Sequence, residues 1–97
     1  MANGIKIDPS IQSKLKVKHN VKCSEVLECF ANVSKGFLTD NRETHKTNPP
    51  TQWFVEQTDN GRWLFIAFMY IDETVVIKTA YDADETKKRL YSKLVSN

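Results

Sequence analysis

Glycine is scarce in this 97-residue sequence, and its scarcity excludes one class of binding site. The three glycines, Gly4, Gly36 and Gly61, lie far apart, so no glycine-rich loop is present to hold a nucleotide phosphate with backbone amides. The Gly-x-Ser-x-Gly motif that carries the nucleophile of α/β-hydrolases is also absent. Any chemistry is therefore carried by side chains outside these motifs.

Cysteine and histidine are equally sparse, with two residues of each type. Cys23 and Cys29 lie six positions apart in a predicted helix, which puts them on different faces and too far apart for a disulfide bond. These cysteines do not form a metal site by their spacing, and neither do His19 and His45. We expect reduced thiols in a cytoplasmic protein that uses no metal ion or other cofactor.

Long apolar runs are missing as well. No run approaches the length of a membrane span, and the N-terminus lacks the basic and then apolar pattern of a signal peptide. With 40% hydrophobic residues, the composition is that of a folded globular chain. These features predict a single domain, residues 1–97, without membrane association, and they leave the oligomeric state open.

Positive charge is concentrated near the N-terminus, although the formal charge of the whole chain is only +2. The first 24 residues contain five lysines and one acidic residue, Asp8. A basic patch of this kind attracts polyanions. A lysine-rich, solvated helix face explains the same residues equally well.

The order of apolar runs and turn-forming residues predicts an α+β domain. We expect helices at 9–18, 23–32 and 82–94, and strands within 36–40 and at 52–57, 63–71 and 75–81. Short connections make consecutive strands antiparallel. The predicted fold is therefore two N-terminal helices on an antiparallel sheet of about four strands, followed by a C-terminal helix.

Two features of this predicted fold depend on individual residues. Asn60-Gly61 predicts a hairpin turn with positive φ at both central positions. Phe68 on the apolar strand, with Leu27 and Leu90 on the helices, is expected in the core.

Basic and aromatic side chains gather in segments outside the apolar stripes. The candidate catalytic residues are His19, Arg42, His45, Arg62 and Tyr81, and the candidate substrate-binding residues are Lys18, Lys46 and Lys78. Arginine and lysine neutralise phosphates, aromatic rings stack on bases, and histidine transfers protons near neutral pH. Cleavage of RNA without a metal ion needs a base, an acid and a cation, which these residue types supply. We expect His19, together with Arg42, His45 and Lys46, to approach Arg62 or Tyr81 on one side of the sheet.

Several segments together resemble a known family. "KHNV" followed by "SEVLECF" looks like the N-terminal pattern of BrnT-type toxins, small ribonucleases of bacterial type II toxin–antitoxin systems. "VIKTAYDADETKKRLY" is similar to their final strand and helix, and the likeness extends over about residues 7–91. It implies a RelE-like fold, cleavage of messenger RNA without a metal ion, and a cognate antitoxin as protein partner.

The loop "NRETHKTNPPTQWF" and the ending "KTAY" match one subgroup better than BrnT-type proteins in general. Members of this subgroup often carry the name ADP-ribosyl-(dinitrogen reductase) hydrolase, which is a minor alternative. The well-understood enzymes with that activity are large, all-helical proteins that bind two magnesium ions through several carboxylates, and this short chain has no such cluster in its sequence.

One position departs from the pattern of the toxins. Tyr81 stands where BrnT-type toxins tend to have arginine. Either Arg42 or Arg62 supplies the missing charge, or the chain is a non-catalytic module that binds RNA or an acidic protein. Both readings remain open at the level of sequence.

Overall fold

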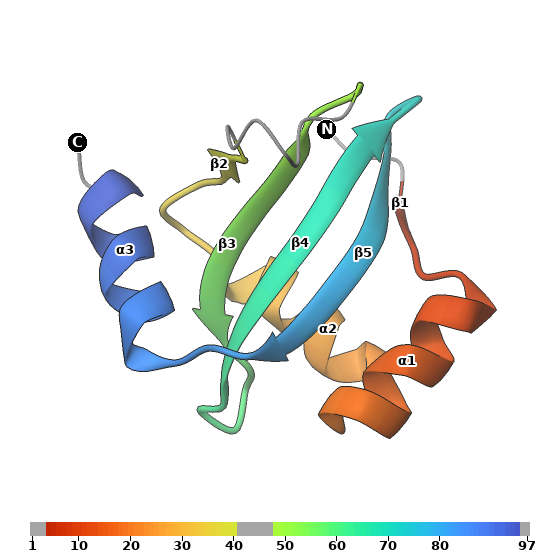
Figure 1. The fold of residues 1–97 in the computed structure, drawn as a ribbon, viewed down its shortest axis with the longest axis horizontal. Helices are drawn as coiled ribbons and strands as arrows, with labels where there is room; N and C mark the ends of the chain where they lie inside the picture. The colour runs from red at the N-terminus through yellow and green to blue at the C-terminus, as the bar shows by residue number, and fades with distance from the viewer. Residues whose placement is uncertain (1–3, 41–47, 96–97) are drawn as a thin grey trace.

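The computed structural model describes residues 4–40 and 48–95. The elements follow one another as β1 (Gly4–Lys6), α1 (Pro9–His19), α2 (Cys23–Asn32), β2 (Leu38–Thr39), β3 (Thr51–Gln57), β4 (Trp63–Ile71), β5 (Thr74–Asp82) and α3 (Glu85–Val95) (Figure 1). The predicted α+β class is confirmed, and each helix begins and ends within three residues of its predicted bounds. None of these described helices is long and apolar enough to cross a membrane.

The sheet has five strands in the order β1-β5-β4-β3-β2. Strands β2 to β5 pair with antiparallel neighbours, as short connections require. The prediction of a purely antiparallel sheet of about four strands is wrong at one edge, where β1 pairs in parallel with β5 and Ile5 lies opposite Val75. Three residues are too short to show an alternating pattern, and their partner strand lies near the other end of the chain.

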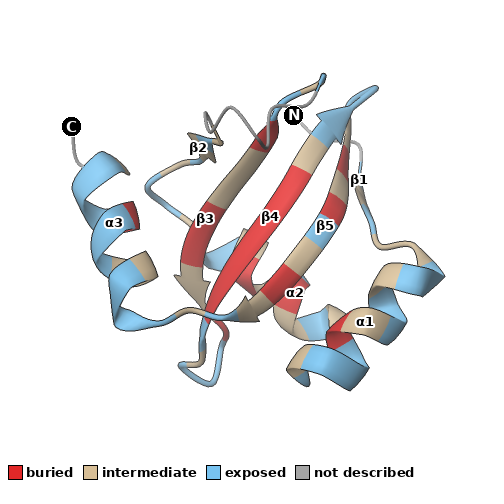
Figure 2. Ribbon diagram, in the orientation of Figure 1, coloured by how far each residue is buried: buried red, intermediate tan, exposed pale blue. Residues whose placement is uncertain are grey.

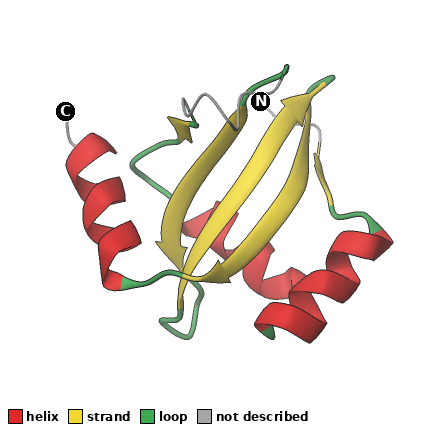
Figure 3. Ribbon diagram, viewed as in Figure 1, coloured by secondary structure: helices red, strands yellow, loops and turns green. Residues whose placement is uncertain are grey.

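The helices are divided between two positions around the sheet. Helix α1 packs against β5 and helix α2 lies behind the sheet against β3, whereas α3 lies on the other side, next to β2 and β3 (Figures 1 and 3). Strand β4 is buried along most of its length because it is central in the sheet (Figure 2). Phe68 on β4 contacts Phe30 of α2 with ring centroids 5.3 Å apart, and Phe54 on β3 joins them at 4.8 Å from Phe30. This cluster forms the core between the sheet and the N-terminal helices.

The core prediction holds for Phe68 and is wrong for two helical leucines. Leu27 is 48% exposed and Leu90 is 41% exposed. Leu27 lies one position from Val26, and this rotation of about 100° takes it off the buried stripe that Val26 and Cys29 form. On α3 the anchor is Tyr91 instead, whose hydroxyl donates a hydrogen bond to the Gly36 carbonyl oxygen at 2.7 Å.

The two hairpin turns differ in which residues take a positive φ. Between β3 and β4 only Gly61 has a positive φ, 88°, so the expected positive φ at Asn60 is wrong. The Thr58 N–H donates to the Arg62 carbonyl oxygen at 2.8 Å, which closes a three-residue connection of the type that ends in a glycine bulge. Positive φ at both central positions occurs between β4 and β5, at Asp72 (49°) and Glu73 (63°).

Candidate nucleic-acid interface

His19 is placed by the end of α1. Asn20 adopts the left-handed conformation, with φ 52° and ψ 44°. Its N–H donates to the Lys16 carbonyl oxygen at 3.2 Å, and the Val21 N–H donates to that of Leu15 at 3.0 Å. The chain then turns inward, and Val21 enters the core. This ending leaves the His19 ring half-buried, with its centroid 5.6 Å from the ring of Tyr81 on β5.

A hollow of about 500 Å³ lies at this point of the surface, lined by Lys18, His19, Tyr81 and Asp82. Three of these residues are sequence candidates, and they come from two segments that are distant along the chain. The hollow combines an imidazole and a phenol, which transfer protons, with one ammonium group and one carboxylate. These are the group types that phosphate chemistry without a metal ion uses.

Arg62 connects the two segments that line the hollow. Nε and Nη2 donate to the two Asp82 carboxylate oxygens at 2.7 and 3.1 Å. Nη1 donates to Glu25 Oε1 at 3.0 Å and to the Asn20 carbonyl oxygen at 2.8 Å, and Nη2 also donates to the His19 carbonyl oxygen at 3.1 Å. The guanidinium therefore fixes the last residues of α1 against the end of β5, where Asp82 lies.

These contacts change the ionisation of both partners. The hydrogen bonds to Asp82 raise the pKa of Arg62 despite its partial burial. The same hydrogen bonds, with the charge of Arg62, lower the pKa of Asp82. Because its donors already have acceptors, Arg62 is placed to position His19 rather than to meet a phosphate directly.

A row of aromatic rings leads away from the hollow on the sheet face opposite to α1 and α2. The rings of Tyr81 and Phe65 stack with centroids 4.8 Å apart and planes at 17°, and Phe65 stacks on Trp53 at 5.3 Å. Tyr91 of α3 ends the row, 6.0 Å from Trp53. The ammonium of Lys87 lies 4.7 Å from the Phe65 ring centroid. Phe65 and Tyr91 are buried, whereas Trp53 and Tyr81 are partly exposed. Partly exposed rings beside a cation are suited to stacking on unpaired bases.

Lys78 lies on the same sheet face but away from the hollow. The register of β4 and β5 shifts between Ala67 and Phe68, and Lys78 is the extra residue of this bulge. Its Nζ lies 3.3 Å from Thr51 Oγ1, across the sheet on β3. It is three residues from Tyr81, which is about 10 Å along an extended strand.

The remaining sequence candidates, Arg42, His45 and Lys46, lie outside the described residues, so their approach to Tyr81 stays a prediction. The sequence analysis missed Asp82 and Glu25, the carboxylates that form ion pairs with Arg62, because both are distant from Arg62 along the chain.

The row of rings was also missed, although the aromatic content of β3 and β4 was a signal. Phe65 lies opposite Tyr81, and Trp53 lies opposite Ala67, which is two residues from Phe65 on the same face, so the row follows once the strand register is known. Nothing in the sequence states that register.

Within residues 4–40 and 48–95, no three His, Cys, Asp or Glu side chains come together in a group that could hold a metal ion. No protein-family model matches the sequence, and no curated protein matches it either.

Proposed function

We propose that this chain is an endoribonuclease that cleaves single-stranded RNA without a metal ion, at the hollow around His19 and Tyr81. The observation that carries the proposal is the 5.6 Å approach of these two rings, with Lys18 at the same hollow. The partly exposed rings of Tyr81 and Trp53, both stacked on buried Phe65, support it, because they offer ring surface for bases on the same sheet face.

The reaction follows from the groups present. The neutral imidazole of His19 accepts the proton of a 2′-hydroxyl, the 2′-oxygen attacks the adjacent phosphorus, and the bond from phosphorus to the 5′-oxygen breaks. The hydroxyl of Tyr81 donates a proton to the departing 5′-oxygen, and the ammonium of Lys18 neutralises charge on the phosphorane. The products are a 2′,3′-cyclic phosphate and a 5′-hydroxyl end.

The resemblance to BrnT-type toxins supplies the biological setting of the proposal. On this reading the fold is RelE-like, the protein acts in the cytoplasm, and a cognate antitoxin binds it. The order of two helices, an antiparallel meander and a C-terminal helix agrees with that expectation. Arg42, His45 and Lys46 belong to the loop that matches the subgroup, and we assign them to RNA binding and proton transfer.

A second candidate is a non-catalytic module that binds RNA on the same surface. The observation that favours it is the engagement of Arg62 with Asp82 and Glu25, which leaves Lys18 as the cation of the hollow within the described part of the chain. Binding with no cleavage at any pH would support this candidate.

The test is product analysis with single-stranded RNA in the presence of EDTA. We expect fragments with cyclic-phosphate ends, and a loss of cleavage of about 100- to 10,000-fold in His19→Ala and Tyr81→Phe, since general acid–base groups contribute on this scale. Tyr70→Phe is the matched control, because Tyr70 is an exposed tyrosine of β4 outside the hollow. Equal activity in all three variants would assign the cleavage to a contaminant and refute the proposal.

A further inference from the structure

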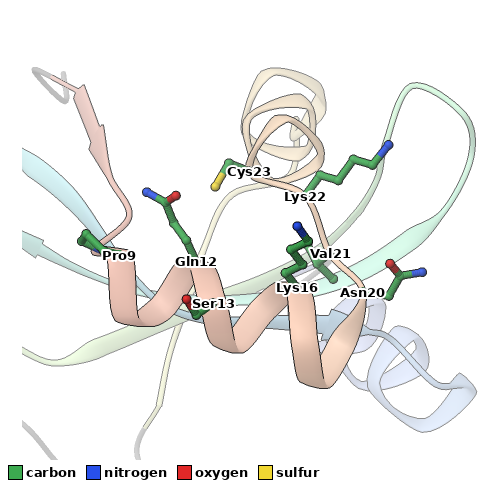
Figure 4. A pocket seen from close by; sticks show the side chains of 8 residues that line it. All are labelled: Pro9, Gln12, Ser13, Lys16, Asn20, Val21, Lys22 and Cys23. Atoms are coloured by element: carbon green, nitrogen blue, oxygen red, sulfur yellow. The ribbon is translucent and has the colours of Figure 1, made fainter.

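A second hollow lies between the two N-terminal helices. It has a volume of about 560 Å³ and runs between α1 and the start of α2. Figure 4 shows Gln12, Ser13 and Lys16 along α1 and Cys23 at the first position of α2, with Lys22 extending outward from the connection. We call this feature the α1–α2 groove.

The α1–α2 groove lies in the most basic stretch of the chain. From Pro9 to Cys23 there are four lysines, including Lys16 and Lys22, and no acidic residue. None of the four forms an ion pair in the described part of the molecule. The two carboxylates that flank this stretch already have partners. Asp8 forms an ion pair with Lys6 at 3.5 Å, and Glu25 accepts hydrogen bonds from Arg62 and from the Lys22 backbone N–H. The positive charge of the groove is therefore uncompensated.

Exposed apolar side chains lie one helical turn from the groove on both helices. Val17 follows Ser13 by four residues on α1 and is 82% exposed, and Leu27 follows Cys23 by four residues on α2. A ligand in the groove therefore meets lysine ammonium groups and aliphatic carbon together. No aromatic side chain lines the groove to stack on a base.

We propose that the α1–α2 groove binds a short amphipathic segment of a partner protein, with Asp or Glu side chains toward Lys16 and Lys22 and aliphatic side chains toward Val17 and Leu27. The charge of the groove selects an acidic ligand. The aliphatic rim and the lack of stacking rings select a peptide over RNA. This inference does not depend on RNA cleavage at His19.

Cys23 provides a reporter of occupancy. It lines the groove and is partly exposed, whereas Cys29 is buried and burial raises the pKa of its thiol to about 12. At about pH 8 a thiol reagent should therefore modify Cys23 and spare Cys29 in the folded protein. A peptide seated in the groove should slow this modification.

The probe is a synthetic peptide with glutamates on one helical face and leucines on the other. Its matched controls are the same peptide with lysines in place of the glutamates and a single-stranded RNA. The protein variants are Lys16→Glu/Lys22→Glu in the groove and Lys35→Glu/Lys93→Glu elsewhere, which change the net charge equally. Val17→Ser/Leu27→Ser tests the apolar rim at two exposed positions.

We expect the glutamate peptide to slow modification of Cys23 in the native protein and in the Lys35→Glu/Lys93→Glu variant. Its dissociation constant should rise roughly tenfold or more in Lys16→Glu/Lys22→Glu and severalfold in Val17→Ser/Leu27→Ser. Equal protection in the groove variant, or stronger protection by the lysine peptide, would overturn the proposal.

Two further results would also overturn it. Protection of Cys23 by RNA but not by peptide would assign the groove to nucleic acid. Protection that rises with protein concentration alone would assign it to a second copy of the chain. RNA cleavage by the His19→Ala variant is measured separately, so failure of the groove proposal is distinguishable from failure of the nuclease proposal.

Discussion

The guanidinium of Arg62 connects three parts of the chain that are distant in sequence. It reaches the carbonyl oxygens at the end of α1, Glu25 in the first turn of α2 and Asp82 at the end of β5. A helix ends with carbonyl groups that lack internal partners, and Arg62 satisfies those of His19 and Asn20. Its removal therefore leaves several acceptors without a donor at once.

Replacement of Arg62 by methionine should lower the free energy of unfolding by roughly 1–3 kcal/mol, since unsatisfied, partly buried acceptors cost about this much. Chemical denaturation checks the value. Arg89→Met, at an exposed arginine of α3, is the control and should change stability by less than about 0.5 kcal/mol. Similar effects for both variants would show that the contacts of Arg62 contribute nothing beyond those of a surface charge.

The ion pair between Arg62 and Asp82 makes the stability of the protein depend on pH. Its pKa in the folded protein lies below the ordinary value of 3.8 because of the hydrogen bonds from Arg62. Below pH 3.8 the unfolded chain takes up the proton first, so the stabilisation by ionised Asp82 is present above this pH and is lost as pH falls through the folded pKa.

Asp82→Asn removes this titration. The difference in unfolding free energy between native protein and variant should shrink as pH falls below the ordinary pKa of 3.8. Denaturant titrations at several pH values measure it. A difference that stays constant down to about pH 2 would contradict the assignment to Asp82.

At the scale of elements, the turn between β4 and β5 carries a strained pair of residues. Asp72 and Glu73 both have positive φ, although neither is glycine. Residues with a Cβ atom are disfavoured in this region by about 1–2 kcal/mol each. The hairpin nevertheless forms, because β4 and β5 pair from Ile71 and Thr74 next to the turn to Leu64 and Asp82, with a single bulge at Lys78.

Glu73→Gly should therefore raise the free energy of unfolding by roughly 0.5–1 kcal/mol, since relief of the left-handed conformation exceeds the added entropy of glycine in the unfolded chain. Thermal unfolding checks the direction. Glu73→Ala is the control: it removes the carboxylate, keeps Cβ and should give no such gain. A gain of equal size in Glu73→Ala would assign the effect to charge instead of backbone conformation.

The same elements show what a sequence can predict here. Strand β4 is predictable to the residue because nine nearly continuous apolar residues lie between two turn signals. Strand β1 is not, since its three residues become a strand only by pairing with β5. The hairpin between β3 and β4 forms as predicted, but the positive φ expected at Asn60 does not occur. The length and register of the connection, rather than the Asn-Gly preference alone, decide which residues take positive φ.

The candidate site was also predictable only in part, because some of its residues are recognised from local sequence and others only from tertiary contacts. The sequence pattern predicts His19 at the end of a helix and Tyr81 at the end of a strand. Their imidazole and phenol groups make both residues candidates for proton transfer. The role of Arg62 is decided by Glu25 and Asp82, which approach it only through tertiary packing. The sequence alone therefore indicates which residue types line the hollow, but it does not indicate whether Arg62 or Lys18 faces the ligand.

At the scale of the whole molecule, the two proposed ligand surfaces lie on either side of the end of α1. Lys18 and His19 line the hollow, and Lys16 and Asn20 line the α1–α2 groove. A helix is about 10 Å across, which is close to the screening length at physiological ionic strength. Two anionic ligands bound at once should therefore repel each other through α1.

The glutamate peptide should accordingly weaken RNA binding, by roughly twofold for each pair of charges about 10 Å apart in water. By linkage, RNA should weaken peptide binding by the same factor, and the factor should fall as salt is raised. Fluorescence anisotropy measures both affinities with a 2′-O-methyl oligonucleotide, which lacks the attacking hydroxyl and stays intact. An RNA dissociation constant that does not change would show independent surfaces, whereas one that rises in proportion to peptide concentration without limit would show a single shared surface.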